Sequence, residues 1–384
     1  MRAGAPLRRL GTMSVETFVR RYWQRRALCI RKAIADFTNP VDRADLLALA
    51  ADPDVESRLV RHSARGWQLR HGPFSARQVP AMGQPDWTLL VQGVDLHRAA
   101  VAQLAARFRF LPVARFDDVM ISLAGDGGGV GPHVDQYDVF LLQAQGRRRW
   151  RIARQFDPAL VAGLPLKVLA NFAAQDEWIL EPGDALYLPP GVAHEGVALG
   201  PCMTISVGFR LPAWQELVET WHERQARTAP RTGRLHDGTR TPTPEAARLP
   251  ASMIDAAAQE LRRITVSRRD AARTLLEHLS EPKPTVVYDT PRPALPAARF
   301  AASARKCGVI LDLRSRLLFA GADFAINGEL VPVAVAARSR LRRLANRGSL
   351  EAARIGPPET AATEPLMRLL YDWYRCGWLH LAAL

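Results

Sequence analysis

The sequence has few cysteines, few lysines and no long apolar run. Its four cysteines lie far apart without a CxxC pair, which argues against a zinc ribbon or a disulfide framework and suits a reducing compartment. No stretch reaches the ~18 apolar residues of a membrane-spanning helix. Residues 1–13 are basic and lack the apolar core of a secretory signal. We therefore expect a cytoplasmic protein that does not enter a membrane.

The chain is strongly basic, with a net charge of +14 over 384 residues. Lysine occurs only at Lys32, Lys167, Lys283 and Lys306, so nearly all of the positive charge is arginine. Biased genome composition explains such a pattern, and so does a surface that attracts polyanions such as ribosomal RNA. The composition is otherwise that of a globular protein, with 48% hydrophobic residues, and the length favours two or three domains.

The middle of the chain is dense in strand signals. Between Asp118 and Arg210 it reads VMISLAG, YDVFLLQ, RRRWRIA, EWILEPG, DALYLPPG and MTISVGFR, separated by Gly and Pro turns. Short strands at this spacing indicate an antiparallel sandwich or barrel. Ahead of it, Ser14 is a candidate cap for a helix, followed by a strand-like LCIRKA.

Beyond the strand-rich region the composition and the hydrophobic periodicity of the sequence change. Residues 224–250 are rich in Arg, Thr, Pro and Gly and predict a linker, and helical periodicity returns from Ser252 to Leu279. The tail mixes short helices and strands and predicts a small winged-helix-like module. Its arginines are expected to form an exposed basic strip made of Arg338, Arg340, Arg342 and Arg343. We divide the chain into an N-terminal α/β part of the catalytic region (1–84), a catalytic core (85–212), a linker with a helical region (213–298) and a C-terminal module (299–384).

A histidine and a carboxylate lie two residues apart in the phrase GPHVD. On a strand, positions i and i+2 point to the same face, so His133 and Asp135 can present their side chains together. His194 is the last residue of a second motif, PGDALYLPPGVAH. Two histidines and one carboxylate form a facial triad that leaves open positions on an octahedral metal, as non-haem Fe(II) oxygenases require.

An arginine is predicted to point into the core. In GRRRWRI, Arg148 shares a strand face with Trp150 and Ile152, whereas Arg147, Arg149 and Arg151 share the other face. A buried guanidinium requires an anion. The distal carboxylate of 2-oxoglutarate would suit its planar fork, and an internal salt bridge to Asp or Glu is the alternative.

The phrases GGGVGPHVDQYDVFLLQAQGRRRWRI, EPGDALYLPPGVAHEG and MTISVGFR resemble the JmjC-type ribosomal oxygenases of bacteria, and most closely the branch that hydroxylates an arginine of ribosomal protein L-sixteen. The resemblance implies a mainly β core, the double-stranded β-helix or cupin/JmjC jelly roll. It also implies a helical dimerisation segment and an α+β winged-helix C-terminal region. Fe(II), 2-oxoglutarate and O₂ would be required.

Carried over by position, the resemblance makes His133, Asp135 and His194 the iron ligands. It makes Arg148 and Ser122 contacts of 2-oxoglutarate. Two further residues are candidates for substrate binding. Asp126 lies in the loop GDGGG, where it pairs with an incoming arginine or simply forms a turn, and Tyr137 borders the mouth of the site.

The expected function is hydroxylation of an arginine of a large-subunit ribosomal protein by a homodimer that works near ribosomal RNA. The dimer is expected to form through the apolar side chains of residues 252–279. The alternative is that these side chains pack against the rest of their own chain. Two alternatives stay open. One is a JmjC hydroxylase of another residue, such as a histidine of a different ribosomal protein. The other is a non-catalytic, cupin-like nucleic-acid-binding protein.

Overall fold

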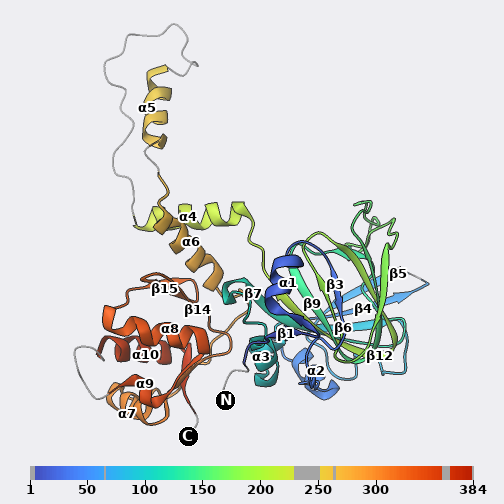
Figure 1. Ribbon diagram of the computed structural model, residues 1–384, viewed down its shortest axis with the longest axis horizontal. Helices are drawn as coiled ribbons and strands as arrows, with labels where there is room; N and C mark the ends of the chain where they lie inside the picture. Colours follow the sequence, from blue (N-terminus) through green and yellow to red (C-terminus); the bar gives the residue numbers. More distant parts are fainter. Residues whose placement is uncertain (1–4, 65, 229–250, 263–264, 357–363, 383–384) are drawn as a thin grey trace. The chain divides into compact units, whose positions relative to one another are not determined.

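The computed structural model describes residues 5–64, 66–228, 251–262, 265–356 and 364–382 (Figure 1). The chain divides into two compact units. The first contains Met1–Leu211, Pro282–Arg316 and Ala334–Leu384, and the second contains Pro212–Glu281 and Leu317–Val333. Among the described residues, no helix combines the length and the apolar character needed to cross a membrane.

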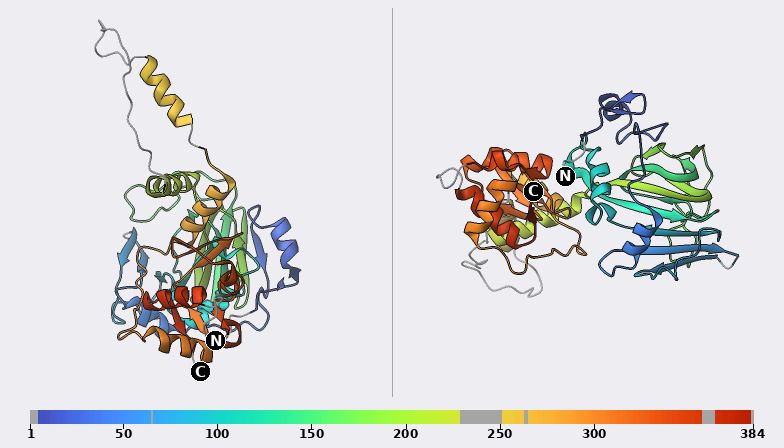
Figure 2. Two further views of the ribbon diagram at one scale, coloured as in Figure 1. Left: turned by 90° about the vertical axis from the view of Figure 1, so that its left-hand side faces the viewer. Right: turned by 90° about the horizontal axis from the view of Figure 1, so that it is seen from below.

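The first unit is built around a ten-stranded antiparallel sheet that curls on itself (Figure 2). Eight strands follow the order β3-β11-β9-β12-β7-β6-β4-β5, while β10 pairs with β9 and β8 pairs with β12. The strands are β3 (Leu28–Ile30), β4 (Ser57–Ser63), β5 (Gly66–His71), β6 (Trp87–Val91), β7 (Phe116–Ala124), β8 (His133–Val134), β9 (Asp138–Ala153), β10 (Asp176–Leu180), β11 (Ala185–Leu188) and β12 (Ala193–Phe209).

Two long strands, β9 and β12, run through both halves of this sheet. Their pairing breaks at one point, with residues 138–145 opposite 203–209 and residues 147–153 opposite 193–199. Gly146 and Gly200 lie at the break with φ of +64° and +79°, which side chains rarely allow. A Cβ on Gly146 would also lie 2.2 Å from the Pro201 carbonyl oxygen. The glycines therefore let the ribbon turn between the two layers of a jelly roll.

The two faces of the sheet carry different clusters. On one face, Phe18 of α1 (Val15–Arg21) packs against Phe140 and Tyr187, and the Ser14 hydroxyl caps this helix by accepting from the Thr17 N–H. The helices α2 (Arg43–Ala50) and α3 (Ala99–Ala106) add buried leucines to the same cluster. The opposite face forms the interior of the roll and is lined by Val139, Leu141, Trp150, Ile152, Leu180, Leu186, Leu188 and Val192.

The C-terminal part of the first unit is a small α+β module. Its elements are α7 (Ala297–Cys307), β13 (Val309–Leu311), η3 (Val335–Ala337), α8 (Arg338–Arg347), β17 (Ser349–Leu350), α9 (Ala352–Ile355), α10 (Glu364–Arg375) and β18 (Leu379–Leu381). α10 buries Leu366, Leu370 and Trp373 at helical spacing, and α8 ends at Gly348, whose φ is +71°. Short additional elements of the first unit are β1 (Arg9–Leu10), β2 (Met13–Ser14), η1 (Val94–Leu96) and η2 (Val113–Arg115).

The second unit combines three helices with a three-stranded sheet. These are α4 (Trp214–Thr228), α5 (Ala251–Arg262), α6 (Arg268–Ser280), β14 (Leu317–Ala320), β15 (Asp323–Ile326) and β16 (Glu329–Val331). Ser267 and Asp270 form a capping box at the start of α6. The helix lies on the sheet, and its Arg273 pairs with Asp323 at 2.9 Å.

Three expectations need correction. YDVFLLQ and RRRWRIA are one strand rather than two, because Gly146 bends β9 without ending it. The predicted linker begins too early, since Arg224 lies in α4 and is buried, where it donates to the Thr274 hydroxyl at 3.0 Å. Residues 229–250 lie outside the described residues. The basic strip is less open than expected because Arg343 pairs with Glu351 at 3.0 Å, and only Arg342 of its four arginines is exposed.

Candidate functional site

The three predicted metal ligands come together at one end of the roll. His133 lies on β8, Asp135 follows it, and His194 lies on β12 directly opposite His133. The Asp135 Oδ2 atom lies 3.9 Å from His133 Nε2 and 3.7 Å from His194 Nε2. All three ligand atoms lie within 4.8 Å of one another, which is the spacing of groups that share one ion.

Backbone carbonyls orient both imidazoles. The Gly131 carbonyl oxygen lies 2.9 Å from His133 Nδ1, and the Val192 carbonyl oxygen lies 3.0 Å from His194 Nδ1. A hydrogen bond from Nδ1–H leaves Nε2 as the free lone pair, and the two Nε2 atoms are the ones that face Asp135. Burial and the neighbouring His133 lower the pKa of His194 to about 4. At neutral pH His194 is therefore an uncharged imidazole ready to bind a metal.

This donor set fits a divalent first-row metal. Two imidazoles and one carboxylate are the ligands of the facial triad found in non-haem Fe(II) oxygenases. The hydrogen bonds to the Gly131 and Val192 carbonyls hold each imidazole in the tautomer that a metal needs. The Asp135 and His133 side chains are about a quarter exposed, whereas His194 is buried, so the cluster is reached from one side.

Arg148 lies in the interior as the strand alternation predicted. Its residue is 5% exposed, and its Nη1 donates to the Ser122 hydroxyl at 3.3 Å. The Nε and Nη2 atoms are buried and have no hydrogen-bond partner among the residues that the structure describes. No carboxylate of the described residues pairs with this guanidinium, so the internal salt bridge that the sequence left open does not form. Two unpaired donors of a buried cation make a site for an anion.

Two more unpaired polar atoms lie in the interior, and the sequence did not single them out. The Trp150 Nε1 atom is buried without a partner, and its ring lies 6.1 Å from the His194 ring and 5.7 Å from the Arg148 guanidinium. The Thr88 hydroxyl is also buried and unpaired. It lies on β6 opposite Ala124, on the sheet face that carries Ser122. The sequence could have pointed to this hydroxyl, because Thr88 is a single polar residue in the otherwise apolar strand WTLLV.

The two candidate substrate contacts have different surroundings. The Asp126 carboxylate accepts from the Gly200 N–H at 2.6 Å, and its carbonyl oxygen accepts from the Asp86 N–H at 2.7 Å, which ties its loop to β12. Tyr137 is 38% exposed beside the triad. Partial burial and the Asp135 carboxylate raise the pKa of Tyr137, and the charge of Asp118 adds to this effect.

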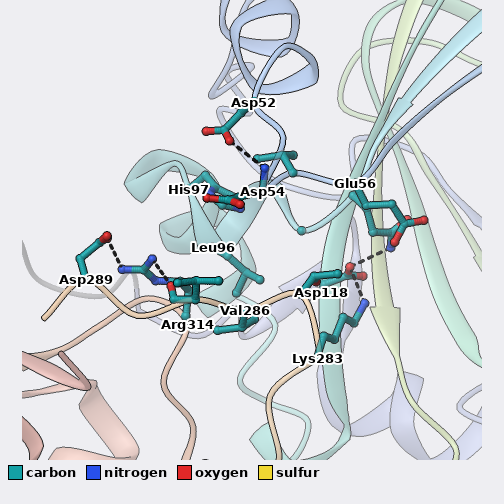
Figure 3. Close-up of a pocket in the computed structure, with 15 residues that line it drawn as sticks. Asp52, Asp54, Glu56, Leu96, His97, Asp118, Lys283, Val286, Asp289 and Arg314 are labelled. Atoms are coloured by element: carbon teal, nitrogen blue, oxygen red, sulfur yellow. Dashed lines mark hydrogen bonds and ion pairs between the residues drawn. The ribbon is translucent and has the colours of Figure 1, made fainter. Parts of the chain in front are cut away.

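A cavity of about 230 Å³ lies in the first unit and is not lined by the triad residues (Figure 3). Its lining includes five carboxylates, those of Asp52, Asp54, Glu56, Asp118 and Asp289. Several of its polar groups are already satisfied. Lys283 Nζ and Gln92 Nε2 each donate to Asp118 at 2.7 Å, and Arg314 pairs with Asp289 at 2.9 Å (Figure 3). The cavity therefore lies where contacts such as Lys283–Asp118 hold the segment Pro282–Arg316 against β7, and no triad residue lines it.

The jelly roll and its triad define a JmjC-type oxygenase domain, and the JmjC domain family matches residues 103–217. A ROXA-like winged helix matches residues 259–380. The X-ray structure of E. coli YcfD superposes with a TM-score of 0.85 at 31% identity, covering 97% of this chain and 100% of that one. A second structure shows YcfD, a ribosomal oxygenase from E. coli, in complex with cobalt and 2-oxoglutarate. It superposes with a TM-score of 0.83 at 31% identity, and the match covers 98% of this chain and 100% of that one. The chain belongs to the ribosomal oxygenase family.

Sequence relatives agree with the structures. The E. coli ribosomal protein uL16 3-hydroxylase is 43% identical over 208 residues, which are 54% of this chain and 55% of that protein. A probable ribosomal oxygenase of Haemophilus influenzae is 35% identical over 209 residues, 53% of this chain and 51% of its own length. These matches span about half the length of each relative.

Proposed function

We propose that the protein is an Fe(II)- and 2-oxoglutarate-dependent dioxygenase that hydroxylates an arginine side chain of large-subunit ribosomal protein uL16. One observation carries the proposal. A facial triad of metal-binding side chains and a buried guanidinium with two unpaired donors lie in the interior of the same jelly roll. The similarity to the E. coli uL16 3-hydroxylase supports the choice of substrate.

In this proposal His133, Asp135 and His194 hold the iron, which supplies the redox chemistry with O₂ that oxidises 2-oxoglutarate and the substrate C–H bond. The chain's residues bind and orient the reactants. Arg148 pairs with the distal carboxylate of 2-oxoglutarate through Nε and Nη2, and the Ser122 hydroxyl holds the guanidinium and contacts the same carboxylate. The apolar lining around Ile152 keeps water away from the reacting groups.

The mouth of the site suits a cationic substrate side chain. The Asp135 carboxylate lies beside the exposed Tyr137, whereas the nearby Asp117 and Asp118 are already paired with Arg210 and Lys283. A phenol hydroxyl and a carboxylate at the mouth can accept hydrogen bonds from an arginine side chain. We assign Tyr137 to the wall that receives the substrate. We also propose that Asp126, which is exposed, uses its remaining acceptor capacity toward the basic ribosomal protein.

The regions outside the core are proposed to assemble and to dock. Apolar side chains stand exposed on the helices of the second unit at Trp214, Val218, Ile254 and Leu275. We propose that a second copy covers them in a homodimer, with 213–298 as the linker and dimerisation region between the core (85–212, preceded by 1–84) and the C-terminal module (299–384). The arginines of α8 would place the ribosomal substrate near ribosomal RNA in the cytoplasm.

Turnover of 2-oxoglutarate tests this function. The purified protein is loaded with Fe(II) under anaerobic conditions and mixed with 2-oxoglutarate, with or without a uL16 peptide, before O₂ is admitted. Succinate formation that depends on O₂ and increases with the peptide is expected. Equal stimulation by an unrelated ribosomal peptide would contradict the substrate assignment. No succinate under any condition would favour the non-catalytic alternative.

A further inference from the structure

The loop that carries His133 is supported very differently from the strand that carries His194. His194 lies inside the long strand β12, which pairs with both β9 and β8. β8 has only two residues, His133 and Val134, and its one partner among the described strands is β12. The short strand cannot by itself fix the direction of the His133 imidazole, because few ladder hydrogen bonds hold it.

Gly131 provides the missing support. Its carbonyl oxygen is the partner of His133 Nδ1 at 2.9 Å, so the position of this peptide sets the tautomer and the direction of the ring. Gly131 is buried with φ of +79°. A Cβ built there would lie 3.1 Å from the Trp67 ring and 3.0 Å from a Val168 methyl group. Two side chains from distant parts of the sequence therefore fill the space that a side chain at this position would need.

These two side chains come from elements that carry no ligand. Trp67 lies on β5 and stacks on His62 with ring centroids 4.3 Å apart. Val168 is buried in the segment between β9 and β10. The next residue of that segment, Leu169, donates its N–H to the Pro132 carbonyl oxygen at 2.8 Å. The segment thus holds the loop through a side chain at Gly131 and through the backbone at Pro132.

We propose that Trp67 and Val168 are positioning residues, which clamp Gly131 by packing together against the position that a side chain would occupy and so direct His133 Nε2 toward the metal. The inference rests on the proposed function in that the triad binds a metal. Loss of either side chain leaves space beside Gly131, the peptide moves, and the imidazole loses its fixed direction. A methyl group at Gly131 forces the same movement by strain, because positive φ disfavours a side chain.

Binding of cobalt alone tests the clamp without any turnover. Co(II) is titrated into the full-length protein, and the visible absorption bands report ligand geometry while the titration gives affinity. Trp67→Ala, Val168→Ala and Gly131→Ala are each expected to weaken Co(II) binding by up to about 10–100-fold, the effect of losing the hydrogen bond between His133 Nδ1 and the Gly131 carbonyl. Their bands should also shift. Trp67→Phe, which keeps an aromatic ring at this position, should recover most of the affinity.

Val161→Ala is the matched control, because Val161 lies in the same segment as Val168 and is exposed. It should bind Co(II) like the unmodified protein. Unchanged affinity and unchanged bands in Gly131→Ala and in either clamp variant would overturn the clamp alone, while the triad assignment would stand. If the unmodified protein bound no Co(II), both the clamp and the proposed function would fail. A clamp variant that does not fold is replaced by Trp67→Leu, which removes the ring but keeps an apolar side chain, and the same weakening of Co(II) binding is expected.

Discussion

Replacement of Arg148 should remove most of the affinity for 2-oxoglutarate. The side chain is buried at 5% exposure, and within the described part of the chain its one hydrogen bond is the 3.3 Å contact to Ser122. Nε and Nη2 are free to donate to a carboxylate, which would form two charge-assisted hydrogen bonds in a water-poor interior. Arg148→Ala removes both donors and leaves the bound carboxylate unpaired.

The expected loss follows from these contacts. Hydrogen bonds to charged groups contribute about 1.5–3 kcal/mol each, and truncating one partner of a buried charged pair costs about 2–5 kcal/mol. With about 1.4 kcal/mol for each factor of ten, the dissociation constant of 2-oxoglutarate should rise about 30-fold or more. Calorimetric titration of the cobalt-loaded protein measures it, and Co(II) affinity should stay unchanged. Arg148→Lys keeps the positive charge but lacks the planar pair of donors. Its dissociation constant for 2-oxoglutarate should therefore lie between those of Arg148→Ala and the unmodified protein.

Arg147→Ala is the control, because Arg147 is a neighbour on the same strand that points to the exposed face. Its affinity for 2-oxoglutarate should equal that of the unmodified protein. An independent readout is thermal protection, since a ligand at about 100 times its dissociation constant stabilises by about 2.7 kcal/mol. That protection should disappear in Arg148→Ala. Equal binding by Arg148→Ala and the unmodified protein would refute the assignment of the anion site to this guanidinium.

Three further outcomes are expected. Asp135→Ala should abolish both Co(II) binding and 2-oxoglutarate turnover, and full activity of this variant would contradict the triad. Burial raises the pKa of Asp95 from its ordinary 3.8 to about 7; the stability that this carboxyl contributes is therefore complete below about pH 4 and lost as the pH rises through 7. Asp95→Asn removes this titration, so between pH 5 and pH 8 the melting temperature of the variant should fall less with rising pH than that of the unmodified protein, and an equal fall in both proteins would contradict the assignment. Trp214, which is 85% exposed, should lie in the dimer interface, so light scattering should give a dimer mass for the intact chain and a lower mass for Trp214→Glu; a monomer mass for the intact chain would disprove the dimer.

The sequence predicted the parts of the site that strand periodicity determines. His133 and Asp135 share a phrase, and Arg148 alternates with its neighbours, so each side chain could be assigned to a face. The strand that lies opposite His133 could be identified only from the motif that ends in His194. The structure adds the distances among the triad atoms and the orienting carbonyls.

Other features depend on contacts that no local pattern records. Gly146 reads as a turn signal, and the sequence alone could not tell a bend in a strand from its end. Arg224 reads as part of a polar linker because its burial depends on Thr274 of another helix. The clamp at Gly131 joins side chains separated by about a hundred positions along the chain, so only folding brings them together.

Tandem mass spectrometry of uL16 tests the central claim most directly. Purified uL16 is incubated with the protein, Fe(II), 2-oxoglutarate and O₂, with Asp135→Ala as the inactive control. The account predicts one added oxygen atom on an arginine side chain, present with the unmodified protein and absent with the variant. Oxygen on a histidine, or uL16 left unmodified while 2-oxoglutarate is consumed, would contradict it.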